Sequence, residues 1–403
     1  MTDSIVVLTP EPPYPLRGGG AFRIASLIHY FARFAAVDLI FLSDSGKPAE
    51  LPDGLVRRQT VIPLPPSSKS LLARYWRNGW RAIRGVPPLV DRVSGLEAEV
   101  ARALAGRRYN AGIVEHFWAA GYLPQMKAAC DEVVLDLHNI ESTLHARCAV
   151  TSGGLVSLGH RRFAARSLAM ERVLLPQYSR VLITSADDEA QARHIAPGAR
   201  TSVYPNAYPY EERNDGPPQP NTVVFSGNFE YHPNIDGVRF LMREIWPEIL
   251  RFYPAARLRL VGRGEASIRD AVAGFRDVEV TGPVVDAVAE IARGAVVIAP
   301  LRSGSGTRVK ILEAWAAGRA VVSTSMAAEG LFCREGINIA LEDNPAEFAR
   351  RVCELLSDEA KREQLAYEGK HTLIEKYTWE AAWQRLDGIP QVTRFRELSS
   401  YTG

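Results

Sequence analysis

Cysteine is scarce in this sequence, and the few cysteines are far apart. The 403 residues contain four, Cys130, Cys148, Cys333 and Cys353, and no two form a Cys-x-x-Cys pair. This spacing excludes a disulfide framework and offers a zinc ion no recognisable ligand set. We therefore expect a protein of the reducing cytoplasm.

Long hydrophobic runs are absent as well. No apolar stretch approaches the roughly 20 residues that span a bilayer. The N-terminal run from Ile5 to Leu8 follows Asp3 and stops at Pro10, so it does not resemble an export signal. If the protein contacts a membrane, we expect it to do so through its surface, at the inner face of that membrane.

A net charge of one sign is also lacking. The chain holds 48 Lys and Arg against 46 Asp and Glu, a formal charge of +2. This balance gives no reason to expect a protein built around a nucleic-acid backbone. We predict no nucleic-acid partner.

What the sequence does have is an alternation of short apolar runs with helical patterns. Such alternation predicts an α/β fold, because a parallel strand covered on both faces is apolar throughout and needs a helical crossover to return. A first set of runs occupies residues 4–9, 37–42, 111–115, 132–137 and 179–185, and a second set occupies residues 221–227, 256–262, 278–282, 294–300, 319–324 and 337–341.

The two sets are separated by a proline-rich stretch at residues 204–220, which contains five prolines. We predict a Rossmann-like, doubly wound domain over 1–205, a linker over 206–220 and a second such domain over 221–376. Residues 377–403 are predicted to hold a helix that crosses back to the first domain. Helical stretches are expected at 345–376 and 378–388. The ligand is expected in a cleft facing the carboxyl ends of both sets of strands.

The densest motif is PLRSGSGTRVKILEAWAAGRAVVST, residues 300–324. It predicts a strand that ends at Pro300, a Ser/Gly loop, and a helix from Gly306 or Thr307 to a C-terminal cap at Gly318. Free amides at the start of a helix favour a phosphate. The alternative is a plain strand-to-helix turn.

Charged residues in this motif support a diphosphate site. Arg308 and Lys310 supply cations, and Glu313 lies two turns beyond Gly306 on the same helix face. A carboxylate there can accept hydrogen bonds from ribose hydroxyls. The alternative is that Glu313 is a solvated helix residue, but its core-like neighbours argue against that interpretation.

A second glycine-rich segment, PPYPLRGGGAFR at residues 12–23, follows the first strand. Gly18, Gly19 and Gly20 are predicted to open a helix whose amides bind an anion, with Arg17 and Arg23 on either side. The alternative is a flexible connection, but three consecutive glycines carry an entropic cost that a simple connection does not require.

Two further strands end in polar residues suited to catalysis. Glu115 and His116 follow one strand, and the segment LDLHNIES brings Asp136, His138 and Asn139 after the next. A histidine at such a position can donate a hydrogen bond to a sugar hydroxyl or to a developing charge. Asp136 is expected to fix the tautomer of His138. The alternative is that both histidines are structural.

Several of these segments together resemble the nucleotide-sugar half of family 4 glycosyltransferases, which have the GT-B fold. The resemblance is carried by VVFSGNFEYHPNIDGVRFL, FYPAARLRLVGRG, VEVTGPV, APLRSGSGTRVKILEAWAAGRAVVST and AAEGL, with weaker similarity at PPYPLRGGGAFR and LDLHNIES. It implies transfer of a hexose-type sugar from a nucleotide-diphosphate donor, UDP- or GDP-linked, with retention of configuration. It implies a glycan, a lipid-linked glycan or a small molecule as acceptor, and polysaccharide biosynthesis as the setting.

The resemblance also assigns roles to residues. Two glutamates eight positions apart mark the donor site in that family; Glu313 matches the second, which binds ribose, and Ser305 stands at the first. Asn228 and Pro233 lie where many relatives carry a basic pair, so Arg308, Lys310 or Arg302 is expected to neutralise the diphosphate. The predicted donor-binding residues are Gly18, Gly19, Gly20, Gly227, Asn228, Ser305, Gly306, Thr307, Arg308, Lys310 and Glu313.

The remaining roles concern transfer itself. The family places a histidine beside the transferred sugar, here His116 or His138, and we group Glu115 with them as catalytic. Arg17, Arg23 and Asn139 are predicted to bind the acceptor. No Asp-x-Asp pair occurs in the chain, so we expect neither a metal nor another cofactor.

One region departs from the balanced charge. Residues 57–108 hold 11 Lys and Arg but 3 Asp and Glu. Within region 74–84, Arg74, Arg77, Arg81 and Arg84 form one helical stripe near Trp76 and Trp80. This pattern is typical of a helix on an anionic membrane, and equally of a solvated face that covers core aromatics.

Two alternatives to a transferase remain at this point. Ser305 and the missing basic pair are compatible with a non-catalytic subunit that binds nucleotide sugars. A GT-B-fold epimerase acting on sugar nucleotides is the other.

Overall fold

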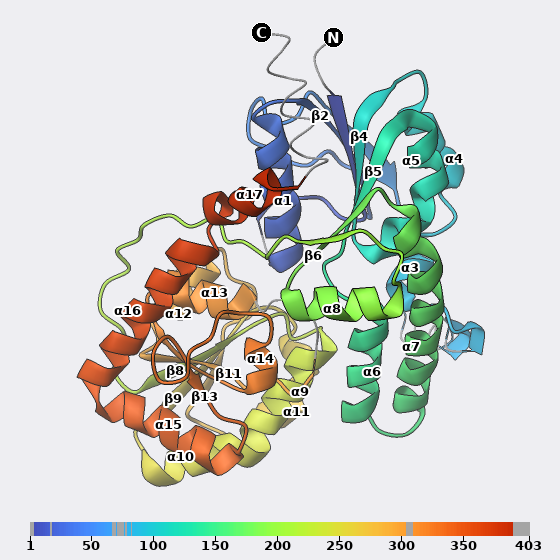
Figure 1. Cartoon of the computed structure of the whole chain (residues 1–403). Coiled ribbons are helices and arrows are strands. Elements are labelled where there is room, and N and C mark those ends of the chain that lie inside the picture. Colours follow the sequence, from blue (N-terminus) through green and yellow to red (C-terminus); the bar gives the residue numbers. More distant parts are fainter. Residues whose placement is uncertain are drawn as a thin grey trace. The chain divides into compact units, whose positions relative to one another are not determined.

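The chain folds into two units, each built on its own sheet (Figure 1). The structure is a computed structural model that describes residues 4–16, 18–66, 70, 76, 79–81, 83–303 and 309–389. The first unit runs up to Ala207 and resumes at Ala382, and the second spans Tyr208–Ala381. Every pairing between described strands is parallel, which confirms the α/β prediction.

The described part of the first unit has a seven-stranded sheet in the order β3-β2-β1-β4-β5-β6-β7. Successive strands move outward from β1 in one direction and from β4 in the other, so the direction of winding reverses between β1 and β4. Ligands of doubly wound sheets bind at such a reversal, beyond the carboxyl ends of the strands. The strands are β1 (Ser4–Thr9), β2 (Ala36–Ser43), β3 (Arg58–Pro63), β4 (Tyr109–Glu115), β5 (Cys130–Asp136), β6 (Arg180–Ile183) and β7 (Thr201–Val203).

Helices connect these strands, and the last helix among the described residues ends in the same unit. In α17 (Trp379–Asp387), Asp387 accepts a hydrogen bond of 2.6 Å from Tyr30 Oη, and Trp383 Nε1 donates one of 3.0 Å to Ser26 Oγ. The other helices are α1 (Gly19–Ala32), α3 (Pro88–Val93), α4 (Glu97–Leu104), α5 (Leu123–Ala129), α6 (Glu141–Thr151), α7 (Gly154–Leu174) and α8 (Ala186–Ile195).

The described part of the second unit has a six-stranded sheet in the order β10-β9-β8-β11-β12-β13, with the reversal between β8 and β11. Its strands are β8 (Thr222–Ser226), β9 (Arg257–Val261), β10 (Val278–Val280), β11 (Val296–Ala299), β12 (Ala320–Ser323) and β13 (Ala340–Leu341). Its helices are α9 (His232–Phe240), α10 (Trp246–Phe252), α11 (Arg269–Val272), α12 (Ala287–Ala292), α13 (Val309–Ala316), α14 (Ser325–Ala328), α15 (Pro345–Ser357) and α16 (Glu359–Lys376).

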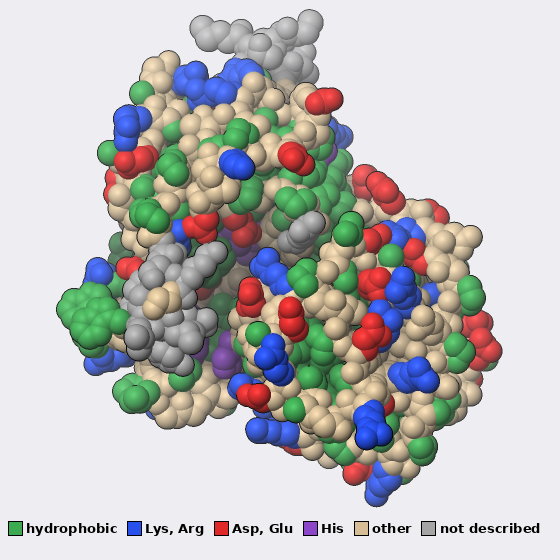
Figure 2. All heavy atoms as spheres, turned by 180° about the vertical axis from the view of Figure 1, so that it is seen from behind, with side chains coloured by type: hydrophobic (Ala, Val, Ile, Leu, Met, Phe, Trp, Pro, Cys, Tyr) green, Lys and Arg blue, Asp and Glu red, His purple; other side chains and the backbone are tan. Residues whose placement is uncertain are grey.

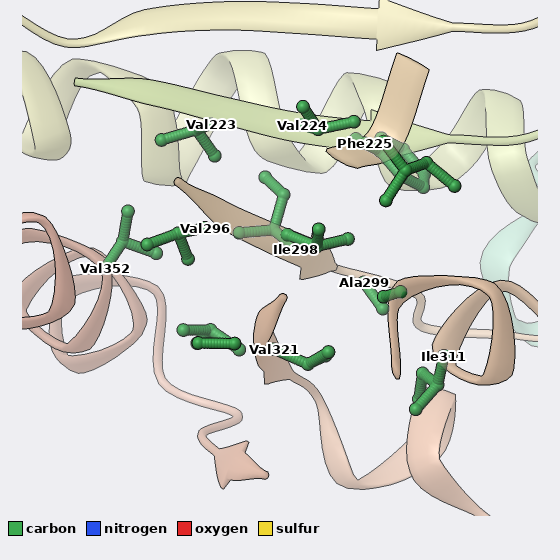
Figure 3. Close-up of a cluster of buried hydrophobic side chains, with 14 of the residues drawn as sticks. Val223, Val224, Phe225, Val296, Ile298, Ala299, Ile311, Val321 and Val352 are labelled. Carbon is green, nitrogen blue, oxygen red and sulfur yellow. The ribbon is translucent and has the colours of Figure 1, made fainter. Parts of the chain in front are cut away.

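The core of the second unit explains why its central strands are apolar from end to end. All residues of β8 and β11 are buried. Figure 3 shows Phe225 of β8, Ile298 of β11 and Val321 of β12 gathered in one cluster with Ile311 of α13 and Val352 of α15. Side chains on both faces of these strands therefore leave water, which is the main stabilising contribution in such a sheet.

Local signals predicted the ends of β11 and α13. The strand ends at Ala299, just before Pro300, and Gly318 has φ +63° beyond the end of α13. The amide of Arg319 donates to the carbonyl of Ala314, the bond that closes a helix of this type.

The predicted single helical stretch at 345–376 is wrong in one respect. It is two helices, because Asp358 stops α15 and caps α16, where its carboxylate accepts a hydrogen bond of 3.0 Å from the amide of Lys361.

The proline-rich segment is anchored to the units at its ends. Tyr204 is fully buried in the first unit, and its hydroxyl donates to Ser26 Oγ at 2.7 Å. The amide of Tyr208 donates to the carbonyl of Tyr377 in the second unit, and that of Gln219 donates to the carbonyl of Arg293. The boundary between the units therefore falls between residues 207 and 208, near the start of the predicted linker.

On the face drawn in Figure 2, acidic and basic side chains are interspersed rather than separated. Among the described residues, no helix combines the length and the apolar character needed to cross a membrane.

Candidate functional site

The glycine-rich segment after β1 lies where the sequence predicted it. Gly18 has φ +84° and precedes α1, which begins at Gly19 without an acidic residue in its first turn. The amides of this turn are therefore suited to an anion. Arg17 lies outside the described residues.

Gly20 brings this segment close to the end of β4. A Cβ atom at position 20 would lie 2.4 Å from Glu11 Oε1 and 3.5 Å from His116 Nε2, so the close approach requires glycine or a displaced Glu11. Glu11 Oε1 and His116 Nε2 are 3.4 Å apart. The loops after β1 and β4 thus meet at the reversal of the sheet. Glu11 was not predicted, because an isolated glutamate beside two prolines carries no signal.

His116 has an unusual backbone conformation, with φ +63°, immediately after β4. Its ring stacks on His138, with centroids 3.5 Å apart, and on Trp118, with centroids 4.2 Å apart and planes 10° from parallel. A non-glycine residue at positive φ carries strain that is common at functional sites. The structure therefore brings the two predicted histidines together.

Glu115 and His138 form a buried hydrogen-bonded pair. Glu115 Oε2 lies 2.9 Å from His138 Nε2, and both side chains are almost inaccessible to solvent. Burial and the nearby Asp136 raise the pKa of Glu115 well above its usual range. Burial and neighbouring His116 lower the pKa of His138 to about 3. Burial thus disfavours charge on both partners of this pair.

Arg23 does not lie at the anion-binding edge, where we predicted an acceptor contact. It is 1% exposed, and its Nε and Nη2 donate to the two carboxylate oxygens of Asp136 at 2.6 Å each. Its Nη1 donates to the carbonyl of Tyr204 and to Asn206 Oδ1. Because all three nitrogen atoms of this guanidinium donate hydrogen bonds within the protein, Arg23 positions other groups rather than binding a ligand.

The role expected of Asp136 changes with this ion pair. Burial acts to raise the pKa of Asp136, but the charge of Arg23 outweighs it and holds that pKa well below its usual range. His138 Nε2 is nearer to Glu115, at 2.9 Å, than to Asp136 Oδ2, at 3.4 Å. His138 Nε2 therefore lies within reach of both carboxyl groups, with Glu115 the nearer. Asn139 follows His138 and is partly exposed.

Glu115, Asp136 and His138 are also the group within the described part of the chain whose donor atoms lie close enough together for a metal ion, within 4.8 Å. However, Arg23 already occupies both oxygens of Asp136. A cation would have to share this carboxylate with a fixed guanidinium, so the donor set fits a metal poorly.

Trp118 and Glu141 extend the cluster. Trp118 Nε1 donates to Glu141 Oε1 at 3.0 Å, and burial raises the pKa of Glu141 to about 7. The Trp118 ring is thereby fixed against His116. Trp118 was not predicted to take part, because a tryptophan after a strand more often indicates packing.

In the second unit, Lys310 lies against the carboxyl end of β8. Its Nζ donates to the carbonyl of Ser226 at 3.1 Å and to Asn234 Oδ1 at 2.7 Å, and it lies 4.6 Å from the centre of the Phe225 ring. Asn234 in turn donates from Nδ2 to the carbonyl of Asn228. The oxygen atoms of Ser226 and Asn234 therefore hold the ammonium group at the end of the strand.

Gly227 and Asn228 shape the same edge. The amide of Gly227 donates to the carbonyl of Val261, so it belongs to the sheet. Gly262, at φ +137°, has no room for a side chain, because a Cβ there would lie 2.0 Å from the carbonyl oxygen of Gly227. The loops after β8 and β9 are thus in backbone contact.

Arg302 is a poorer candidate for neutralising a diphosphate. Its Nη2 and Nε donate to the two oxygens of Asp236, at 2.7 and 3.2 Å, and its side chain is 42% exposed. Its charge is therefore already compensated. The other predicted residues of the loop, Ser305, Gly306, Thr307 and Arg308, lie outside the described residues.

Glu313 lies one turn after Lys310 on α13 and is partly buried. Burial raises its pKa to about 7, against the opposing charge of Lys310. The ribose-binding hypothesis requires that Glu313 does not point into bulk solvent, and its partial burial meets that requirement.

Two serine hydroxyls that the sequence did not suggest lie near the same strand ends. Ser226 ends β8, and Ser303 follows β11; both are buried, and neither hydroxyl has a hydrogen-bond partner among the described residues. Buried hydroxyls without partners are uncommon and are well suited to bind a polar ligand. The sequence signal that could have identified these two serines is their position at or just after the end of an apolar strand.

Comparison with known proteins bears directly on this second unit. Residues 220–358 match the family described as Glycosyl transferases group 1. This range contains Lys310, Glu313 and both serines. These findings indicate a glycosyltransferase.

Solved structures show the fold of the whole chain. Sucrose-phosphate synthase from Thermosynechococcus elongatus superimposes with a TM-score of 0.70 over 99% of this chain and 100% of that chain, at 16% identity. HepE of Anabaena, in complex with UDP and glucose, gives 0.60 over 99% and 98%, at 14% identity. The two units therefore have the GT-B fold, as predicted.

A curated relative is matched over a smaller part. An uncharacterized 44.6 kDa protein in the cps region of Klebsiella pneumoniae is 22% identical over 163 residues, which are 38% of this chain. The match spans 42% of that relative's length.

Proposed function

We propose that this protein is a retaining, metal-independent glycosyltransferase of family 4 that moves a hexose-type sugar from a UDP- or GDP-sugar to a glycan, a lipid-linked glycan or a small molecule. The observation that carries the proposal is the placement of Lys310 at the carboxyl end of β8, with Glu313 one turn further along the same helix. A cation and a carboxylate in this order suit a diphosphate followed by a ribose.

The donor's diphosphate is bound by Lys310, whose ammonium group is held at the carboxyl end of β8 by neutral oxygen acceptors. Ser226 and Ser303 supply hydroxyl donors at the same edge, and Glu313 accepts hydrogen bonds from the ribose hydroxyls. Ser305, Gly306, Thr307 and Arg308 keep their proposed donor roles. Gly227 leaves room for the Asn234 side chain, because a Cβ at position 227 would lie 2.9 Å from Asn234 Nδ2, and the Asn228 carbonyl fixes Asn234 beside Lys310.

The first unit acts on the sugar and the acceptor. His116 donates a hydrogen bond to the transferred sugar, while Glu115 and Trp118 hold the paired rings in place. Gly18, Gly19 and Gly20 approach the diphosphate, and Arg17 and Asn139 bind the acceptor. That the sites of the two units meet in one cleft stays a prediction.

In the proposed transfer, the bond between the anomeric carbon and the diphosphate oxygen breaks, and a bond to the acceptor oxygen forms on the same face. The acceptor proton passes to the departing diphosphate. Lys310 and the helix amides stabilise the charge that develops there, so no metal is required.

The comparisons suggest which donor to test first and in which setting the protein acts. HepE was solved with UDP and glucose, which supports UDP-glucose as the first donor to test. A relative in a cps region supports polysaccharide biosynthesis as the setting. We propose a cytoplasmic location, with region 74–84 contacting the inner face of the membrane; Trp76 and Trp80 of that region are exposed.

A thermal-shift panel of UDP-, GDP-, ADP- and dTDP-sugars tests the proposal, because a ligand that binds the native state raises the unfolding midpoint. We expect one nucleotide series to stabilise the protein and to release nucleoside diphosphate with 10 mM EDTA present. Stabilisation without turnover would favour a non-catalytic subunit. Conversion of the donor to its epimer without acceptor would favour an epimerase.

A further inference from the structure

The hairpin formed by α6 and α7 carries an apolar tip that the proposed transfer does not use. Figure 1 shows the two helices side by side, joined by a short turn. At the tip, Val150 and Leu155 are each 86% exposed, Val156 is 58% exposed and Leu158 is 54% exposed. Val150 comes from the end of α6 and the other three from the start of α7. Four large aliphatic side chains at one end of a hairpin form a concentrated apolar patch, unlike the scattered exposed residues that are normal on a surface.

The tip is held in shape by bonds between the two helices. Ser157 Oγ donates to the carbonyl of Ala149 at 2.7 Å, and the Nδ1 atoms of His145 and His160 are 3.1 Å apart. Phe163 is buried beside His145, with ring centroids 5.4 Å apart. The exposed aliphatic side chains are therefore presented by a braced hairpin.

The hairpin below the tip is cationic. Between residues 142 and 170 the sequence contains four arginines and two histidines, and it contains no aspartate or glutamate. Arg161, Arg162 and Arg166 are exposed on α7, within three turns of Leu158. An anionic bilayer has a negatively charged headgroup surface with hydrocarbon beneath it. Aliphatic side chains at the tip of the hairpin, with arginines one to three helical turns behind them, suit these two layers in the same order.

A second exposed segment lies against the same helix. A Cβ at Gly85 would lie 3.9 Å from the carbonyl oxygen of Arg162 and 3.9 Å from the Cβ of Arg166. Ile83, two residues before Gly85, is 66% exposed, and Trp80 is 54% exposed. The segment from Trp80 to Gly85 thus adds apolar side chains beside the basic part of α7.

We propose that the tip of the α6–α7 hairpin inserts into the interface of an anionic membrane, with Arg161, Arg162 and Arg166 contacting lipid headgroups. Four side chains are few against the 20 to 30 residues per side of a stable protein interface, so a lipid surface fits better than a protein partner. The inference does not depend on the proposed transfer reaction, because it concerns binding to lipid alone.

Co-sedimentation with vesicles tests the proposal directly. The full chain is mixed at low salt with vesicles of phosphatidylglycerol and phosphatidylcholine in equal amounts, or of phosphatidylcholine alone. We expect binding to the mixed vesicles, weak binding to the neutral ones, and release at about 0.5 M salt, where charges are screened over a few ångströms.

Two variants separate the contributions of the tip and of the arginines. The double variant Leu155→Ser/Val156→Ser is expected to weaken binding at least about tenfold, through lost apolar burial. The triple variant Arg161→Ala/Arg162→Ala/Arg166→Ala is expected to lose about fivefold per arginine. Val285→Ser, at a residue 94% exposed in the second unit, serves as the matched control and should bind like the wild type.

Several results would overturn the proposal. One is a wild type that fails to sediment with anionic vesicles, and another is a tip variant that binds unchanged. Binding lost only in Trp80→Ser would assign the contact to region 74–84 instead. A wild type that self-associates by light scattering, with a monomeric tip variant and no vesicle binding, would make the tip an interface between copies. Unchanged unfolding midpoints show that the variants are folded.

Discussion

The imidazole rings of His116 and His138 stack with their centroids 3.5 Å apart, although the two residues come from the ends of different strands. The stack continues through Trp118 to a buried Glu141, and Glu115 bonds to His138 on the other side. His138 is neutral at physiological pH because burial lowers its pKa. In this arrangement His116 is the ring nearest the glycine-rich segment.

Replacing His116 should therefore impair transfer more than donor binding. We expect His116→Ala to lower kcat about 100-fold, because it removes a hydrogen-bond donor at the developing charge. His194→Ala, at an exposed histidine of the same unit, is the control. Steady-state kinetics checks the prediction, and a loss confined to donor KM would place His116 in ground-state binding instead.

Arg23 and Asp136 should contribute mainly to stability. Arg23→Met leaves a buried carboxylate without its partner, and we expect the free energy of unfolding to fall by about 3–5 kcal/mol. Arg193→Met removes a surface pair with Glu189 and a hydrogen bond to Thr201, and should cost about 1–2 kcal/mol. Urea denaturation measures both. Similar losses of unfolding free energy in the two variants would mean that the buried pair stabilises the fold no more than the surface pair does.

Glu141 predicts a pH dependence of stability. Its pKa is about 7 in the folded protein and near 4.5 when unfolded, so folding is penalised progressively as pH rises from about 4.5 to 7. Glu141→Gln keeps an acceptor for Trp118 but does not ionise. We expect the variant to gain on the order of 2–3 kcal/mol over the wild type between pH 4.5 and 8. An unfolding free energy that changes with pH in the same way in Glu141→Gln and in the wild type would contradict this assignment.

Gly262 and Gly282 provide a matched pair of positive-φ glycines. A side chain at Gly262 would collide with the carbonyl of Gly227, whereas Gly282 has no atom within 4 Å of an added Cβ. We expect Gly262→Ala to cost about 3 kcal/mol or more, and Gly282→Ala about 1 kcal/mol. Thermal unfolding of both variants gives the comparison. Equal costs would show that the loops after β8 and β9 can separate freely.

The features that the sequence predicted are those set by neighbouring residues. The strand ending before Pro300, the helix opened by Gly18 and the helix closed by Gly318 each depend on local backbone preferences. The positions of His116 and His138 followed from the rule that parallel strands end at one edge of a sheet.

Contacts made over long distances along the chain were not predictable in the same way. Arg23 pairs with Asp136 across 113 residues, and Lys310 reaches Asn234 across 76. Arg23 was misread because an arginine beside glycines looks like an anion ligand until its buried partner is known. The break at Asp358 was missed because an aspartate is tolerated within an exposed helix face.

In the proposed function, the second unit binds a nucleotide sugar through Lys310 and Glu313. Isothermal titration calorimetry with the donor selected by thermal shift tests it most directly. We predict that Lys310→Met weakens binding at least about tenfold, while Lys361→Met, at a lysine on α16, leaves it unchanged. We also predict that wild-type affinity rises with pH through about 7 and that this rise is lost in Glu313→Gln. Native-like unfolding with an unaltered Kd in both site variants would contradict the account.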